Sequence, residues 1–94
     1  IIESTESDIA AMKEAIGEMQ THSSLGAGCN DYTLSVETSN PNIIRVTEQW
    51  ENMAALAAHF AEPHMVVFQQ AMAANPPKSV NAKFYEATEV SGPG

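Results

Sequence analysis

Two neighbouring stretches that alternate between polar and apolar residues constrain the fold of this chain more than any other feature. Cys29–Glu37 and Ile43–Trp50 both have the period-two pattern that is typical of β-strands with one buried face. The segment between them, Thr38–Asn42, has the composition of a turn. The pattern therefore predicts an antiparallel hairpin. The residues expected to share one face of each strand are Tyr32, Leu34 and Val36 in the first, and Ile44, Val46, Glu48 and Trp50 in the second.

Helical periodicity is present on both sides of this hairpin. Before it, apolar residues recur at helical spacing over Ile9–Met19, and Ser7 is the expected N-cap of that helix. After it, Asn52 is expected to cap a second helix, and Pro63 suits the first turn of a third. Two consecutive prolines end the third helix. The pattern thus predicts one helix before the hairpin and two after it.

The two ends of the chain supply further strands. Ile1 and Ile2 resemble the end of a first strand, most of which we expect to be missing from this sequence. Ser79–Tyr85 is the expected last strand, with Val80 and Phe84 on one face. The order strand, helix, two strands, two helices, strand is typical of the split βαβ arrangement. It predicts a ferredoxin-like α+β fold, βαββαβ, whose single antiparallel sheet carries its helices on one face.

Size and charge limit the organisation of the chain and its partners. With 94 residues, 44% of them hydrophobic, we expect one domain over residues 1–90 and a flexible tail over residues 91–94. The net charge of −8, with only 4 basic residues, argues against nucleic acid and membrane surfaces as partners. One cysteine allows no intrachain disulfide, and we find neither a signal peptide nor a spanning segment, so we expect a cytoplasmic protein.

Large aromatic side chains are expected on more than one face of the sheet. They include Tyr32, Trp50 and Phe84, and we place Trp50 on the face away from the helices. A sheet that is apolar on both faces needs a second cover. A second copy related by a two-fold axis supplies it most simply. The sequence therefore predicts a homodimer in which two sheets face each other, forming a dimeric α+β barrel.

Three segments in the middle of the chain resemble the motifs of one family. Gly28–Tyr32 resembles its GC-x-x-Y motif, Glu48–Trp50 its E-x-W motif, and His59–His64 its H-x-x-x-P-H motif. They follow one another in the family order and at the family spacing. Over about residues 9–86 the chain resembles the antibiotic-biosynthesis monooxygenases of the quinol-monooxygenase type, which are dimeric α+β barrels.

This resemblance implies a reaction that needs neither metal nor flavin. Such enzymes oxidise quinol-like or polycyclic phenolic substrates with O₂, and the deprotonated substrate supplies the electrons. The protein would supply a dry pocket, a proton acceptor, and donors that stabilise the developing oxyanion. The expected partners are therefore a second copy of the chain, a small aromatic substrate and O₂, with no cofactor.

Three aromatic side chains are the first candidates for such a site. His59 can act as general base, because imidazole accepts a proton near neutral pH, or it can be an ordinary helix residue bonded to a neighbour. Trp50 can form a catalytic pocket wall that stacks on the substrate and donates its N–H, or it can be a core residue. Tyr32 can donate its hydroxyl to a substrate oxygen, or it can fill the barrel wall.

Three further residues complete the candidate set as substrate contacts. Glu48 can orient the base or a substrate hydroxyl, or it can pair with Arg45 or Lys83 on an adjacent strand. His64 can contact substrate or only fix the first turn of its helix. Phe68 is included as a substrate contact, although its helical spacing also fits the core.

Other functions stay open for this chain. His59 and His64 are five residues apart and separated by a proline, whereas helical metal ligands are commonly four apart, so we expect no metal site. Related small dimers isomerise or degrade sugar phosphates or bind and open haem, and His59 would be the axial ligand for haem. A non-catalytic barrel that binds a small apolar ligand fits the same motifs.

Overall fold

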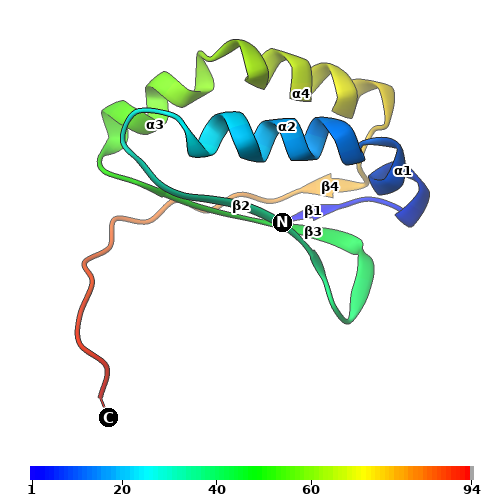
Figure 1. Ribbon diagram of the computed structural model, residues 1–94. Helices are drawn as coiled ribbons and strands as arrows, with labels where there is room; N and C mark the ends of the chain where they lie inside the picture. The colour runs from blue at the N-terminus through cyan, green and yellow to red at the C-terminus, as the bar shows by residue number, and fades with distance from the viewer. Residues whose placement is uncertain (94) are drawn as a thin grey trace.

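All four helices in the described residues lie on one side of a four-stranded antiparallel sheet (Figure 1). The computed structural model describes residues 1–93. In chain order the elements are β1 (Ile2–Glu3), α1 (Glu6–Ala11), α2 (Lys13–Ser24), β2 (Cys29–Glu37), β3 (Asn40–Trp50), α3 (Met53–Phe60), α4 (Pro63–Ala74) and β4 (Ser79–Val80). The strand order β2-β3-β1-β4 is that of the split βαβ arrangement, so the predicted ferredoxin-like α+β class is confirmed.

The predicted hairpin is present, with a tighter turn than expected. Two residues, Thr38–Ser39, form the turn, and β3 already begins at Asn40. Pro41, which we predict in the turn, therefore lies in the strand. A register shift after Val36 leaves Pro41 without a partner in β2, so its missing N–H costs no ladder hydrogen bond.

The face of the hairpin beneath the helices carries the core. Tyr32 pairs with Glu48 and Leu34 with Val46, and these positions point toward α2 and α4. The buried hydrophobic core consists of Ile2, Met12, Met19, Tyr32, Ile44, Met65 and Phe68. Trp50 packs against this core, so its placement on the opposite face is wrong. Alternation shows which residues share a face, but it does not show which face the helices cover.

The helical segment before the hairpin is divided in two. Met12 ends α1 with ψ near 0°, and α2 begins at the next residue. The N-cap is Thr5, whose hydroxyl accepts a hydrogen bond from the Asp8 N–H at 3.2 Å, so the prediction of Ser7 is wrong. The caps after the hairpin are confirmed: the Asn52 side chain accepts from the Ala55 N–H at 2.9 Å, and Pro63 is the first residue of α4.

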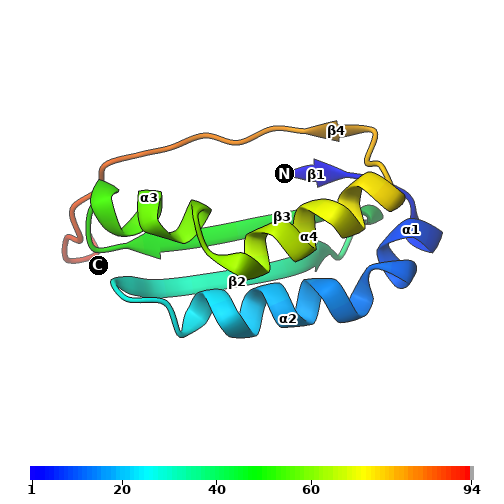
Figure 2. The same cartoon turned by 90° about the horizontal axis from the view of Figure 1, so that it is seen from above.

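The last strand is much shorter than predicted. Only Ser79–Val80 pairs with β1, and residues 81–93 have no regular secondary structure. Figure 2 shows β4 at the edge of the sheet beyond β1. The side chains of Val80 and Phe84 are about 60% exposed, at 58% and 60%. Nothing in the described chain covers these residues, so their alternation creates no buried face. No helix within residues 1–93 has the length and apolar character needed to cross a bilayer.

The outer edge of β2 is occupied by side chains of α2. The Leu34 N–H, which points away from β3, donates to the Gln20 side-chain oxygen at 2.9 Å. The Ser24 hydroxyl donates to the Tyr32 carbonyl at 3.3 Å. Two adjacent outward-facing backbone groups of this edge strand are therefore satisfied within the domain.

Two glycines give a matched test of the backbone. Gly28 has a φ of +78°, and a Cβ there would meet the Ala55 Cβ at 2.7 Å, whereas a Cβ at Gly17 in α2 would meet nothing within 4 Å. We expect Gly28→Ala to lower the free energy of unfolding by about 2 kcal/mol. Gly17→Ala should raise it by about 0.5–1 kcal/mol. Urea unfolding of both variants checks this; a neutral Gly28→Ala would contradict the tight packing of this loop on α3.

Candidate active site

Three rings and a carboxylate meet where the ends of the hairpin lie under α3. The ring centroids of Trp50 and His59 are 4.8 Å apart, and those of Tyr32 and His59 are 5.3 Å apart. Tyr32 and Trp50 are in edge contact at 6.5 Å. Glu48 lies between Tyr32 and Trp50 on the same face of the sheet. The His64 ring lies 5.7 Å from that of His59, so the structure brings together five of the six predicted site residues.

Local structure explains why these side chains converge. The register pairs Tyr32 with Glu48 and Cys29 with Trp50, so three of the four groups belong to two adjacent strands. Asn52 caps α3 immediately after β3, which turns the chain back over the sheet. His59 then falls in the last turn of α3, on its buried side.

Glu48 connects the tryptophan to the histidine. The Trp50 Nε1–H donates to Glu48 Oε1 at 3.0 Å, and the His59 Nε2 lies 3.8 Å from the same oxygen. Arg45, considered above as a partner of Glu48, instead pairs with Glu37 at 2.9 Å. The indole N–H is therefore bonded to a side chain of the same protein.

His59 is a buried imidazole with one unpaired nitrogen. The residue is 3% exposed, and its Nδ1 has no hydrogen-bond partner. Burial lowers the pKa of His59 below its usual value, and the nearby His64 acts in the same direction. Glu48 and Glu62 oppose the shift, but burial is the largest cause. The neutral imidazole is therefore favoured, with Nδ1 as its free acceptor when Nε2–H faces Glu48.

This lowered pKa predicts how stability changes with pH. An unfolded chain protonates His59 near its ordinary pKa of 6.5, whereas the folded protein does so only at lower pH. The unfolded state then binds more protons between the two values, so the free energy of unfolding falls as the pH drops through this window. Urea unfolding is measured at about pH 7.5 and about pH 5.5. Between these two values the free energy of unfolding should fall less in His59→Gln than in the wild-type protein. An equal loss in both proteins would contradict the assignment.

Tyr32 is held in its neutral form. Its side chain is buried, and burial, with the Glu48 carboxylate as the next cause, raises its pKa well above the usual value for a phenol. The Ser23 hydroxyl acts in the opposite direction through a side-chain interaction. A neutral phenol in a low-dielectric setting is a hydrogen-bond donor, which is the property needed to stabilise an oxyanion.

His64 lies behind this group and has partners that the sequence does not indicate. Its Nε2 is 3.1 Å from the Ser23 hydroxyl, and its ring stacks with that of His22 at a centroid distance of 5.7 Å. Ser23 and His22 are 41 and 42 residues away along the chain, and no motif connects them to His64. Among residues 1–93, no three histidine, cysteine or carboxylate side chains form a group that could hold a metal ion.

Phe68 has a different environment from the other candidates. It is 8% exposed and belongs to the hydrophobic core. It also lines a small apolar cavity together with Ile2, Ser4, Ile9, Met12, Ile44, Met72, Asn75 and Pro77. None of the other candidate site residues lines that cavity, so Phe68 packs away from the aromatic group.

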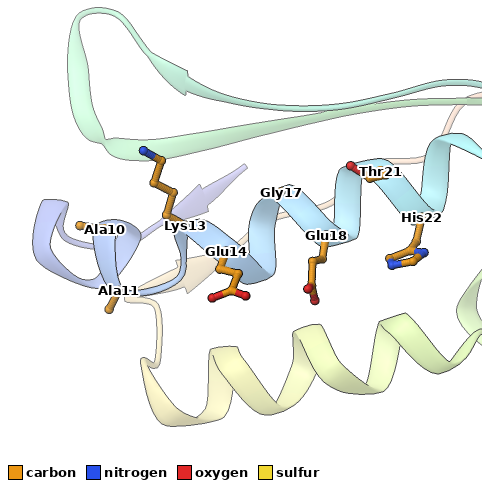
Figure 3. Close-up of a pocket in the computed structure, with 8 residues that line it drawn as sticks. All are labelled: Ala10, Ala11, Lys13, Glu14, Gly17, Glu18, Thr21 and His22. Atoms are coloured by element: carbon orange, nitrogen blue, oxygen red, sulfur yellow. The ribbon is translucent and has the colours of Figure 1, made fainter.

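An open depression lies elsewhere on the surface, along α1 and α2 (Figure 3). It is wide and open to solvent, and Figure 3 shows the charged side chains of Glu14 and Glu18 along it. Such a surface does not enclose an aromatic ring. His22 lies at one end of this depression, so the depression reaches the ring that stacks on His64.

The fold defines the class of this protein as a ferredoxin-like α+β domain with an aromatic group between sheet and helices. Comparison with known proteins agrees with this class. The model of the antibiotic biosynthesis monooxygenase family matches residues 3–71, a span that includes Tyr32, Glu48, Trp50, His59 and His64. The chain therefore belongs to this family. A search of curated protein sequences found no match.

Three solved structures share the fold. One, from Deinococcus radiodurans and provisionally described as an antibiotic biosynthesis monooxygenase, is 20% identical with a TM-score of 0.80, covering 97% of this chain and 93% of that chain. A Pseudomonas aeruginosa protein is 23% identical with a TM-score of 0.79 and coverages of 93% and 88%. A Mycobacterium tuberculosis protein is 20% identical with a TM-score of 0.70 and coverages of 93% and 92%. At these identities the likeness supports the fold alone.

Proposed function

We propose that this protein is a cofactor-independent monooxygenase that oxidises a quinol-like or polycyclic phenolic substrate with O₂. The observation that carries the proposal is the pair formed by Glu48 and His59. The carboxylate faces the His59 Nε2, while Nδ1 is buried and unpaired beside two aromatic rings. This is the arrangement of a general base whose proton-accepting nitrogen points into the protein. Membership of the monooxygenase family supports the same chemistry.

Each residue of the group has a defined task in this proposal. His59 removes the proton of a substrate hydroxyl, and Glu48 stabilises the imidazolium that results. Tyr32 donates its hydroxyl to the substrate oxygen as charge develops there. The electron-rich substrate anion then reduces O₂, with one oxygen atom entering the product and the other leaving as water.

Substrate access involves Trp50. The three rings are packed against one another, and neither the surface depression nor the small core cavity is lined by them. A planar substrate therefore enters only when one ring moves. Trp50 is half-buried, whereas Tyr32 and His59 are buried. Trp50 is thus the ring that borders solvent and would then stack on the substrate.

Oxygen uptake by the purified protein tests this function. A panel of reduced quinols and anthrones is measured against the autoxidation rate of each compound. We expect oxygen uptake above that rate in the wild-type protein and loss of the excess uptake in Trp50→Phe. Tyr85→Phe is the control and should keep the excess uptake, because Tyr85 is 80% exposed. Excess uptake that persists in the Trp50 variant would place the chemistry elsewhere.

The alternatives give different results with the same sample. A haem protein would shift the Soret band of added haemin and lose the shift in His59→Ala. A non-catalytic binding protein would be stabilised by aromatic compounds that it does not consume. Absence of oxygen uptake combined with either result would replace the oxygenase proposal.

We also propose that the functional unit is a cytoplasmic homodimer. The sheet face away from the helices is uncovered in one chain (Figure 1), and the segment after β4 exposes Phe84 and Tyr85. The exposed positions of the hairpin on this face are polar, including Thr33, Arg45 and Thr47, so the interface would be less apolar than the sequence suggests. Light scattering at micromolar concentration tests the assembly, and a stable monomer would contradict it.

A further inference from the structure

One carboxylate oxygen of Glu48 faces two ring nitrogens. The Trp50 Nε1–H donates to Glu48 Oε1 at 3.0 Å, an ordinary hydrogen-bond length. The His59 Nε2 lies 3.8 Å from the same oxygen, which is too far for a hydrogen bond. The carboxylate is therefore bonded to the indole and only close to the imidazole.

Glu48 is the member of this group with the most room to move. Its side chain is 29% exposed, so part of the carboxylate borders solvent, whereas the His59 side chain is 2% exposed. The His59 ring is also held by the rings of Tyr32, Trp50 and Phe60 around it. A carboxylate shift of about 1 Å would bring its oxygen within the length of a charge-assisted hydrogen bond to Nε2.

The charge on His59 decides which donor the carboxylate prefers. While the imidazole is neutral, the indole makes the shorter contact. Protonation adds a full positive charge on the His59 side, and a carboxylate bonds a cationic donor more strongly than a neutral one. The indole ring would stay in place, because its centroid lies 4.8 Å from that of His59 and an aromatic face attracts a cation.

We propose that Glu48 couples the protonation of His59 to the hydrogen bond of Trp50. When the unpaired His59 Nδ1 takes the proton of a substrate hydroxyl, the carboxylate moves from the indole N–H to the His59 Nε2–H. The indole keeps its own proton, and its freed N–H donates to the substrate oxygen that has become an anion. One proton transfer thus creates the anion and frees a donor for it. When His59 gives up the proton, Glu48 returns to the indole.

Only the last part of this sequence rests on the proposed function, because donation by Trp50 needs a substrate anion. The exchange of donors at Glu48 needs no substrate. Glu48 acts through Trp50 and is a positioning residue.

Other titratable groups next to His59 have to be told apart from it. They are Tyr32 of β2, Glu48 of β3, Glu62 at the start of α4 and His64 of α4, and Cys29 and Tyr32 also lie near the Glu48 carboxylate. Burial raises the pKa of Tyr32, so its phenol stays neutral. His64 is the neighbouring imidazole, so a variant at each of the two histidines is needed.

The coupling can be tested without any substrate, because Trp50 is the only tryptophan of the chain. The NMR chemical shift of its indole N–H is followed from about pH 8 to about pH 5, together with the ring C–H signals of His59. We expect the indole signal to move upfield with the same midpoint as His59. At about pH 5 the indole N–H should exchange with water about 10-fold faster than in His59→Gln, as expected for the loss of a hydrogen bond to a charged group.

Four variants separate this coupling from other effects. The indole signal should stay constant in His59→Gln. Glu48→Gln keeps an oxygen that can accept from the indole but lacks the charge that the imidazolium attracts, so most of the movement should be lost although His59 still titrates. The movement should persist in His64→Gln and in His22→Gln, the control at an exposed histidine.

Two results would overturn the coupling. One is an indole signal that does not move while His59 titrates in the wild-type protein. The other is a movement of wild-type size in Glu48→Gln, because the charge of His59 would then act on Trp50 directly.

Turnover separates the coupling from the proposed function. If the oxygenase proposal holds, Trp50→Phe keeps an aromatic ring but has no N–H, so kcat should fall by about 100-fold with little change in KM. An unchanged kcat would overturn the donation to the anion. A failure of wild-type protein to take up oxygen would remove the proposed function, while the indole titration would still decide the exchange at Glu48.

Discussion

His59→Gln is expected to reduce oxygen uptake on an accepted quinol by about 100-fold or more, the range that a positioned general base contributes. Glutamine keeps a polar side chain of similar length but has no nitrogen that accepts a proton. In the native protein the His59 Nδ1 is buried without a hydrogen-bond partner, so it is free to accept the proton of a bound substrate. Initial rates at saturating substrate, corrected for autoxidation, measure the loss.

A control on the same helix separates this loss from damage to α3. Met53 begins α3 and is 60% exposed, so Met53→Gln places the same new side chain in solvent. Its uptake should equal that of the wild type. An active His59→Gln variant would show that the Glu48–His59 pair is not the base, and a second variant, Glu48→Gln, would then be expected to retain activity as well.

Phe68→Ala is expected to lower the free energy of unfolding by about 3–5 kcal/mol. Phe68 is a buried member of the hydrophobic core and already borders a small cavity, which the truncation would enlarge. A domain of this size commonly has a total stability of about 5–15 kcal/mol, so the variant would be close to unfolding at room temperature. Urea or thermal unfolding measures the change.

The same substitution at an exposed ring is the control. Phe84 is 60% exposed in the segment after β4, and Phe84→Ala should change stability by no more than about 0.5 kcal/mol in one chain. Phe68→Leu, which keeps most of the buried volume, should remain folded and active. Loss of substrate affinity in a fully stable Phe68→Leu protein would instead support the role of Phe68 as a substrate contact.

The hairpin shows how far a sequence pattern can predict this fold. The alternation in Cys29–Glu37 and Ile43–Trp50 predicts two paired strands and also the set of residues that share each face. It places Tyr32, Glu48 and Trp50 together because period-two spacing is a property of the backbone itself. With the cap at Asn52, the same reasoning brings α3 back over the sheet.

Features that depend on tertiary contacts were outside the reach of such patterns. The break at Met12 leaves the helical spacing of apolar residues unchanged on both sides, so periodicity does not reveal it. Val80 and Phe84 alternate as in a strand, yet a strand needs a neighbour and a cover, and only β1 pairs with Ser79–Val80. The environment of Trp50 depends on which face of the hairpin the helices cover. The period-two alternation shows which residues share a face but does not show which face is covered.

The candidate site divides in the same way. Motif spacing indicates Tyr32, Glu48, Trp50 and His59, all of which lie within a stretch of 28 residues whose local structure is predictable. Ser23 has no motif, and its contact with His64 spans 41 positions of the chain. Only the packing of α2 against α4 brings the two together. Buried serine at a helix end is common, so its residue type alone gives no signal.

The side chains that occupy the outer edge of β2 have a consequence for how copies of this protein can associate. An open strand edge is a template on which further strands add, and repeated addition produces fibres. Here Gln20 and Ser24 already bond two neighbouring groups that an incoming strand would need, the Leu34 N–H and the Tyr32 carbonyl. Addition of a strand across this part of the edge would have to break both bonds first. A Gln20→Ala variant would expose the Leu34 N–H and should make the domain more prone to form ordered aggregates.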